Sequence, residues 1–330
     1  MIDWYKKSKE EKIKAYNVIS AKTALPNYAI EKDWWVVQTL AIVFNMSIGK
    51  HLVFKGGTSL SKSWGIIKRF SEDVDLAVDR SFFGFEGDLG KSKRDRLRKM
   101  NGEYVENTFA LTLEKEFKKR GLTDIEIKVE VARNSDQDPK VVYIYYPNAV
   151  DYPEYIKPRV MLEISCRSLI EPNTSKEIIS LIDEAFPNAS FAQKPISVSS
   201  VNPERTFLEK IFLLHEEFQK EAPRSERMSR HLYDLHKLKK TPECIKGLQD
   251  KNLYQTIVNH RKQFTKVKGV DYEKHSPKSI DFLPPASVFK AYEKDYKEMQ
   301  ENMINEDAPN FEELLTDLRK LKEEINQIKH

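Results

Sequence analysis

The feature that most constrains this chain is a short apolar segment in which alternate positions are aspartate. Asp73 and Asp75 alternate with Val74, Leu76 and Val78, and side chains two residues apart on a strand point to the same face. Aspartate is poorly suited to strands, and two carboxylates side by side repel each other unless a cation lies between them. Such hard oxygen ligands suit Mg²⁺ or Mn²⁺, usually together with substrate phosphates. The segment therefore predicts a divalent-metal site on a strand.

A pair of glycines lies shortly before this strand. Gly56 and Gly57 follow the apolar run 51–54, and glycine lets the backbone approach a ligand closely because it has no Cβ. Thr58 or Ser59 is expected to cap a brief helix that runs through Trp64, whose free N–H groups would favour an anion. Alone, this pattern also fits an ordinary strand-to-helix turn. Together with the aspartates one helix later, it predicts phosphate binding beside a metal ion.

The spacing of these motifs resembles a known signature. Two glycines followed after fifteen residues by Asp-Val-Asp are similar to the signature of polymerase-beta-like nucleotidyltransferases. GGTSLSK, RFSEDVDL and the upstream IEKDWWVVQTL more closely resemble the AbiEii/AbiGii-type abortive-infection family of nucleotidyltransferase toxins, densely over residues 30–78 and sparsely afterwards. The resemblance implies that Asp73 and Asp75 hold the metal. It also implies a group of residues that bind a nucleoside triphosphate: Gly56, Gly57, Thr58 and Ser59, with Lys62 and Arg69 as auxiliaries.

The same resemblance implies a third carboxylate on a later strand. Glu163 is the lone acid in the run 160–165, where it would complete the metal site or take the proton of an attacking hydroxyl. A glutamate that simply faces outward is an equally good interpretation. Glu126 and Glu130, on a predicted strand with an acidic face, compete for this role. The identity of the third carboxylate stays open among these residues.

A lysine and an aspartate in the C-terminal part are further candidates. Lys210 lies on the apolar stripe of a predicted helix, so its ammonium either extends to water or meets a buried anion. NPERTFLEKIFLLH resembles the family helix whose lysine faces the nucleotide phosphates, which favours Lys210 as a phosphate ligand. RMSRHLYDLHKL is similar to the family's final motif. There, Asp234 either pairs with Arg230 at the surface or lies near Lys210 and helps to hold the nucleotide, whereas His231 is interpreted as structural.

The hydrophobic pattern divides the chain into a mixed part and a helical part. Alternation predicts strands at 51–54, 73–79, 124–132, 141–146, 159–165 and 196–201, with helices at 10–22 and 30–46 and across 90–121. Beyond Pro203 the spacing predicts helices only, at 204–220, 227–239, 242–266, 288–299 and 311–329. The predicted fold is α+β: a polymerase-beta-like nucleotidyltransferase domain with a small mixed sheet over 1–202, then a helical domain over 203–330 that contributes Lys210 and Asp234 to the site.

The composition limits location and partners. The two cysteines show no CxxC pattern, which argues against a disulfide framework or a zinc knuckle. No signal peptide and no apolar run of about 18 residues is found, so we expect a soluble, cytoplasmic protein without a membrane partner. The net charge of +4 permits a nucleic acid partner without requiring one. The basic run at 91–99 is either a solvated helix face or a contact for an RNA backbone, and the second interpretation is favoured.

The expected reaction is attack of an acceptor hydroxyl on the α-phosphate of a nucleoside triphosphate. The resemblance further implies the toxin of a toxin–antitoxin, phage-defence system, with a cognate antitoxin, often a DNA-binding repressor, and in some relatives an RNA target, the acceptor end of tRNA. Two alternatives stay open. One is transfer of AMP or UMP to a protein, and the other is a catalytically inactive nucleotide-binding module. Intact Asp73 and Asp75 argue against the inactive module.

Overall fold

The computed structural model describes residues 2–71, 73–131, 134, 137–154, 156–304 and 306–329. The chain divides into two compact units. The first unit contains residues 1–64 and 70–201, and the second contains residues 202–330 together with the short segment 65–69. No helix in the described residues has the length and apolar character needed to cross a lipid bilayer.

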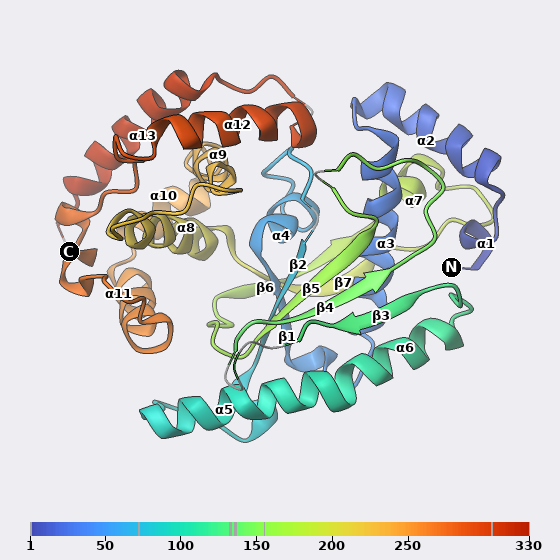
Figure 1. Cartoon of the computed structure of the whole chain (residues 1–330), viewed down its shortest axis with the longest axis horizontal. Helices are drawn as coiled ribbons and strands as arrows, with labels where there is room; N and C mark the ends of the chain where they lie inside the picture. Colours follow the sequence, from blue (N-terminus) through green and yellow to red (C-terminus); the bar gives the residue numbers. More distant parts are fainter. Residues whose placement is uncertain are drawn as a thin grey trace. The chain divides into compact units, whose positions relative to one another are not determined.

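Strands in the described part of the first unit form one seven-stranded mixed sheet (Figure 1). They are β1 (Leu52–Lys55), β2 (Asp73–Val78), β3 (Glu126–Val129), β4 (Lys140–Tyr145), β5 (Arg159–Ser165), β6 (Asn173–Ile178) and β7 (Ile196–Val201). Their spatial order is β3-β4-β5-β2-β1-β7-β6. β2 is parallel to β5 and β1 is parallel to β7, whereas the other neighbouring pairs are antiparallel. The α+β class with a mixed sheet, predicted from the sequence, is confirmed.

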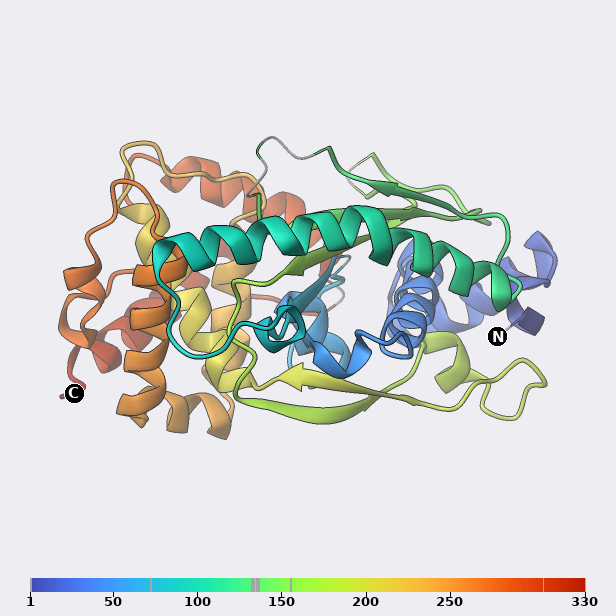
Figure 2. The same cartoon turned by 90° about the horizontal axis from the view of Figure 1, so that it is seen from below.

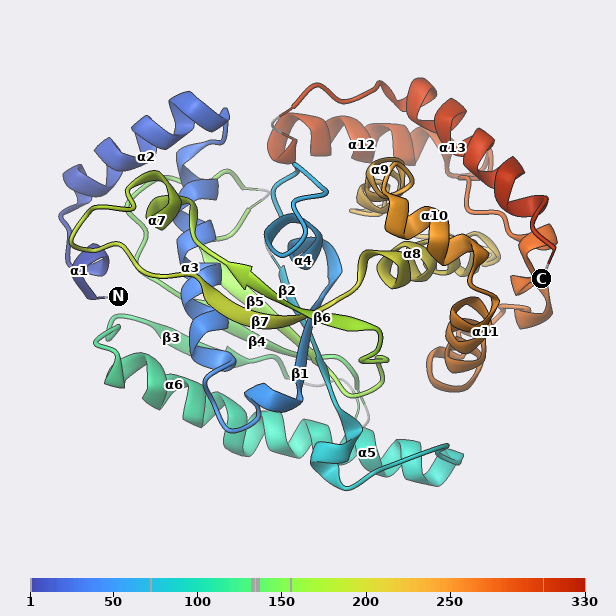
Figure 3. The same ribbon diagram turned by 180° about the vertical axis from the view of Figure 1, so that it is seen from behind.

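Helices of the first unit pack into one core with one face of this sheet. They are α1 (Ile2–Tyr5), α2 (Lys9–Thr23), α3 (Asn27–Val43), α6 (Ala110–Lys119) and α7 (Leu181–Ala185). Figure 3 shows α2 and α7 beside α3. The core side of β2 and β5 consists of their apolar residues, Val74, Leu76, Val78, Val160, Leu162 and Ile164. Because side chains alternate along a strand, Asp73, Asp75 and Glu163 lie on the opposite face, which we call the polar face.

A long helical segment follows β2. It consists of α5 (Lys91–Tyr104), a π-helical turn (Val105–Phe109) and α6, which Figure 2 shows as one nearly continuous teal rod. Val105, Phe109 and the apolar residues of α6 are buried in the core. The basic run lies on α5, where Lys91, Lys93 and Arg96 are exposed. The helix predicted across 90–121 is therefore confirmed as a helical segment, and its basic half faces solvent.

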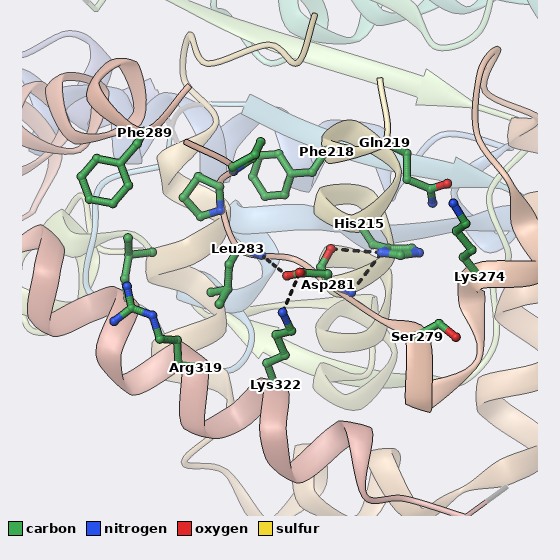
Figure 4. A pocket seen from close by; sticks show the side chains of 13 residues that line it. His215, Phe218, Gln219, Lys274, Ser279, Asp281, Leu283, Phe289, Arg319 and Lys322 are labelled. Atoms are coloured by element: carbon green, nitrogen blue, oxygen red, sulfur yellow. Dashed lines mark hydrogen bonds and ion pairs between the residues drawn. The ribbon is translucent and has the colours of Figure 1, made fainter. Parts of the chain in front are cut away.

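The second unit is helical. Its α-helices in the described residues are α8 (Pro203–Phe218), α9 (Ser229–Leu238), α10 (Pro242–Gln249), α11 (Lys251–His260), α12 (Phe289–Met303) and α13 (Phe311–Asn326). This unit contains a cavity of about 470 Å³, and Figure 4 shows the side chains that line it. Asp281 joins two helices across it: the carboxylate accepts a hydrogen bond from Lys322 of α13 at 2.6 Å, and the backbone N–H donates to His215 Nδ1 of α8 at 3.1 Å.

Several predicted elements need correction. The helix expected at 242–266 is two helices, because Asp250 ends α10 and its carboxylate caps α11 by accepting the Leu253 N–H. The strand expected at 124–132 is shortened to β3, and Ala132 lies outside the described residues. β6 is not predicted, because NTSKEI contains one apolar residue, Ile178, and therefore lacks an alternating pattern.

Candidate active site

Carboxylates and one lysine form a row across the polar face of the sheet. Asp75 lies directly opposite Glu163 of β5 on one side and Lys55 of β1 on the other. Asp73 lies on the same face one pleat away, and all four side chains are half-buried. Neighbouring strands are about 5 Å apart, so these charges interact strongly. Lys55 is missed by the sequence analysis, although its place directly before the two glycines, opposite the DxD strand, could have indicated it.

The electrostatics of Glu163 reflect this crowding. Burial raises the pKa of the Glu163 carboxyl to about 8, and the negative charges of Asp75 and Asp73 add to the rise, whereas Lys55 opposes it. Glu163 also shares a hydrogen bond with Asp75. Among the candidates for a third carboxylate, Glu163 is the one directly across from Asp75, because Glu126 lies on β3, which β4 and β5 separate from β2.

Gly56 is in close contact with the same aspartate. Its φ is +77°, and a Cβ at this position would lie 1.9 Å from Asp75 Oδ2. Two requirements therefore coincide: the left-handed backbone disfavours a side chain, and the carboxylate occupies the space that a side chain would need. The glycine that the sequence assigns to phosphate binding also leaves room for the candidate metal ligand.

A Gly56→Ala substitution tests this contact. We expect transfer activity to fall about 100-fold, because Asp75 must move by roughly an ångström to clear the new methyl group. Gly84→Ala is the matched control, since Gly84 also has a positive φ, +74°, but a Cβ there has nothing within 4 Å. Gly84→Ala should lose only the stability that the positive φ costs, measured by melting, and an equal loss of activity in both variants would contradict a role for this contact in activity.

Other residues of the glycine motif are engaged within the first unit. The Thr58 hydroxyl contacts Ser71 Oγ at 2.9 Å and the backbone carbonyl of Asp73, so it fixes the start of β2. The helix α4 (Gly56–Lys62) begins before Thr58, with Lys55 at its N-cap, and the expectation that Thr58 or Ser59 caps it is wrong. The reason is that the Thr58 side chain bonds to the neighbouring strand instead of to the helix backbone.

Lys62, expected beside the nucleotide, forms an ion pair with Asp33 of α3 at 2.5 Å. Asp33 also accepts the backbone N–H of Leu181 in α7 at 2.7 Å. The pair is largely buried, with 15% and 10% of the two side chains exposed. The Lys62–Asp33 ion pair therefore connects α4 to α3 and helps to position the glycine motif, which lies in the same helix as Lys62.

A second group of charges lies in the second unit. Asp234 accepts two hydrogen bonds from Arg69, at 2.7 Å from Nε and 2.8 Å from Nη2, and it pairs with Lys210 at 2.8 Å. The exposed fractions are 0% for Asp234, 4% for Arg69 and 7% for Lys210. Asp234 is therefore not in a surface ion pair with Arg230, because it is fully buried and bonds to Arg69 and Lys210. The sequence predicts that Arg69 contacts the nucleotide, whereas in the structure its guanidinium donates hydrogen bonds to Asp234.

This second group carries excess positive charge. Burial by itself would raise the pKa of Asp234, but Arg69 and Lys210 outweigh it and hold the pKa well below its usual range. Burial lowers the pKa of Lys210, and Arg69 adds to that effect, whereas Asp234 opposes it. Burial, together with the charge of Lys210, lowers the pKa of His231 well below its usual range, so its ring, 3.3 Å from Lys210 Nζ, is neutral at pH 7. Two cations and one anion leave a net charge of +1 in a buried place.

The donor set of the polar face fits a hard divalent cation. Asp73 and Asp75 supply carboxylate oxygens, and their negative charges add to the burial that raises the pKa of Glu163. In the described part of the chain, no three or more His, Cys, Asp or Glu side chains form a group that could hold a metal ion by themselves. Mg²⁺ is commonly bound by one or two carboxylates plus substrate phosphates, so two aspartates suffice when the nucleotide supplies the remaining ligands.

Comparisons with known proteins match the chain to one family. Residues 42–317 match the family model described as nucleotidyl transferase AbiEii toxin, type IV toxin–antitoxin system. Among solved structures, the chain is similar to MenT4, a nucleotidyltransferase toxin from Mycobacterium tuberculosis H37Rv, with 17% sequence identity, coverage of 94% of this chain and 97% of that chain, and a TM-score of 0.45. No match is found among curated protein sequences.

Proposed function

Because the chain belongs to the AbiEii family of nucleotidyltransferase toxins of type IV toxin–antitoxin systems, we propose that it transfers a nucleoside monophosphate to a hydroxyl at the end of an RNA, with tRNA as the leading acceptor. Family membership implies a nucleoside triphosphate as substrate and a cognate antitoxin as partner. The observation that carries the proposal is the pair of aspartates on the polar face, in contact with the glycine turn through Gly56.

In the proposed reaction, an acceptor oxygen forms a bond to the α-phosphorus while the bond from that phosphorus to the β-phosphate breaks, and pyrophosphate leaves. A bound Mg²⁺ or Mn²⁺ would neutralise charge on the entering and leaving oxygens. Asp73 and Asp75 would hold that ion. Glu163, directly across from Asp75, would take the proton of the attacking hydroxyl once the bound cation favours its ionised form. Lys55 offsets the repulsion among the carboxylates before substrate binds.

Phosphate binding is assigned to the glycine turn and to Lys210. Gly56 and Gly57 present backbone N–H groups to the phosphates. The excess charge of the buried group around Asp234 supports Lys210 as an anion ligand, because an incoming phosphate would relieve it. Arg69 and Asp234 act as positioning residues that fix the Lys210 ammonium. Lys62 acts as a positioning residue for α4 and its glycine turn, through its ion pair with Asp33.

The proposal is tested by incubating the purified protein with Mg²⁺, each of the four α-³²P-labelled nucleoside triphosphates in turn, and total tRNA. We expect label on the RNA from at least one nucleotide, and none with an Asp73→Ala variant. Asp88→Asn, an exposed carboxylate of the same unit, is the control and should label as the wild type does.

The alternatives give different results in the same assay. Label on protein with unlabelled RNA would assign the chain to the protein-modifying class. Nucleotide binding without label on any acceptor would indicate an inactive module, and label that persists in the Asp73→Ala variant would come from a contaminating enzyme.

A further inference from the structure

Aromatic and cationic side chains continue the polar face beyond the carboxylates. Tyr143 and Tyr145 of β4 lie on this face, because β4 pairs with β5 in a register that places Tyr143 opposite Met161 and Tyr145 opposite Arg159. Met161 is in turn opposite Asp73. A single line across three adjacent strands therefore runs from Asp73 through Met161 to Tyr143, and about 10 Å separates its ends. Figure 1 shows β3, β4 and β5 side by side in this half of the sheet.

The rings and the cations form layers. The Arg159 guanidinium lies over the Tyr143 ring, with Cζ 3.9 Å from the centroid, and its Nη1 donates to the Tyr145 hydroxyl at 3.0 Å. Lys128 of β3 lies over the Tyr145 ring at 5.3 Å. The two tyrosine rings are 6.2 Å apart. We call Tyr143, Tyr145, Arg159 and Lys128 the stacking platform.

Ordinary sheet stabilisation does not account for where the platform lies. Cross-strand pairs of aromatic and cationic residues do stabilise sheets, yet the other side of these same strands buries Val142, Ile144 and Val160 completely. The platform residues stay half-buried or exposed on the face that holds the carboxylates. Flat rings and a guanidinium plane left accessible beside a reaction centre are what single-stranded nucleic acid uses for base stacking.

The charges decide which part of a nucleic acid is recognised. Lys128 pairs with Glu126 at 3.1 Å, and Glu130 accepts the Tyr143 hydroxyl at 3.3 Å. With Arg159, these groups sum to zero net charge, so the platform does not attract a phosphate backbone strongly. Base stacking, which every base can supply, is the interaction that it offers.

We propose that the platform binds the unpaired end of the acceptor RNA and delivers its terminal hydroxyl to the carboxylates. This inference rests on the proposed transfer to RNA and narrows the acceptor to an end with unpaired bases. A base stacked on Tyr143 or on the Arg159 guanidinium lies in line with Asp73, so the nucleotide beyond it reaches the carboxylate row. A fully paired blunt end cannot offer an unstacked base and should be a poor acceptor.

Binding of RNA to the protein in the absence of nucleotide tests the proposed platform. The probe is a fluorescein-labelled single-stranded RNA of about ten nucleotides, titrated with the full-length protein and followed by anisotropy, with the same RNA in a blunt duplex for comparison. For Tyr143→Ala and Tyr145→Ala we expect binding to the single strand to weaken about 5- to 100-fold each, equally at low and high salt. Tyr143→Phe keeps the ring and should bind as the wild type does.

Two substitutions of Arg159 distinguish the contribution of stacking to RNA binding from that of charge. Arg159→Lys keeps the charge but not the planar group, so it should bind as weakly as Arg159→Ala, and a fully retained affinity in Arg159→Lys would contradict the stacking role. Melting of every variant identifies loss of fold, and Lys118→Ala, an exposed cation on α6, controls for charge alone. The duplex should bind more weakly than the single strand.

The outcomes distinguish the platform from the transfer reaction. Weaker RNA binding in the tyrosine variants supports the platform even if no nucleotide is ever transferred. Transfer to RNA with an unchanged KM for RNA in Tyr143→Ala would overturn the platform and leave the proposed function intact. Failure of the wild type to bind single-stranded RNA, or label that appears on protein and depends on the tyrosines, would also overturn it.

Discussion

An Asp75→Asn variant is expected to lose nucleotide transfer and yet to be more stable than the wild type at alkaline pH when metal is removed. The loss should be about a thousand-fold or more, because metal-assisted charge neutralisation is worth several kcal/mol. The gain has a separate cause. Asp75 lies opposite Glu163 on the neighbouring strand, and above the raised pKa of Glu163 both carboxylates are ionised and repel each other in a half-buried place. Replacing one by a neutral amide removes that repulsion.

The raised pKa of Glu163 determines how the stability of the wild type changes with pH. Burial, with the charges of Asp75 and Asp73, raises the pKa of Glu163 to about 8 from an ordinary value of 4.5. Between these two values the folded protein binds more protons than the unfolded chain, so the free energy of unfolding falls as the pH rises. In Asp75→Asn the pKa of Glu163 should be lower than in the wild type. The free energy of unfolding should therefore fall less as the pH rises. At about pH 8.5 the variant should be more stable by about 1–2 kcal/mol, which is a few degrees in melting temperature.

Melting in EDTA at about pH 5 and about pH 8.5 measures this difference. Wild type and variant should differ little at the lower pH and clearly at the higher one. Added Mg²⁺ with a nucleoside triphosphate should then stabilise the wild type and not the variant, because ligand that binds only the folded state raises its stability. A variant that melts below the wild type at both pH values would show that Asp75 contributes to the fold and not only to charge repulsion.

The sequence predicts those parts of the site that depend on local pattern. Asp73 and Asp75 are recognisable because they interrupt an apolar alternation, and Gly56 because it follows a strand. The platform tyrosines are missed because their relation to the carboxylates is set by strand register. β4 and β5 are far from β2 in the chain, and only the pairing of Asp73 with Met161, and of Met161 with Tyr143, places them in line.

Charge pairing at long range is missed for a similar reason. Local spacing suggests Arg230 as the partner of Asp234, since residues four apart are neighbours on a helix. The fold instead supplies Arg69, which is 165 positions away in the sequence and belongs to a short segment that packs with the helical unit. No helical periodicity marks that segment, so its place in the second unit depends on tertiary packing alone. The same holds for β6, whose polar sequence forms a strand because β7 pairs with it.

Replacing Asp234 by alanine is expected to destabilise the second unit strongly. The substitution leaves two buried cations, Arg69 and Lys210, without their shared anion, and breaking a buried pair in this way costs about 3–5 kcal/mol. The depressed pKa of Asp234 gives the matching pH dependence: its contribution is present above the ordinary aspartate pKa and is lost in strong acid. Chemical denaturation at neutral pH measures the first effect.

Lys210→Met separates the proposed phosphate-binding role of Lys210 from its structural role. Asp234 keeps both hydrogen bonds to Arg69 in this variant, and methionine occupies the apolar stripe, so stability should change by no more than about 1–2 kcal/mol. Transfer should nevertheless fall about 100- to 1000-fold, because one charge-assisted phosphate contact is lost where negative charge develops. Inhibition of the residual transfer by pyrophosphate should weaken as well, since the proposed ligand of the leaving group is gone. If Lys210→Met instead unfolds as readily as Asp234→Ala and its folded fraction keeps full activity and pyrophosphate affinity, the lysine serves only to pair with Asp234, and the phosphates are held elsewhere.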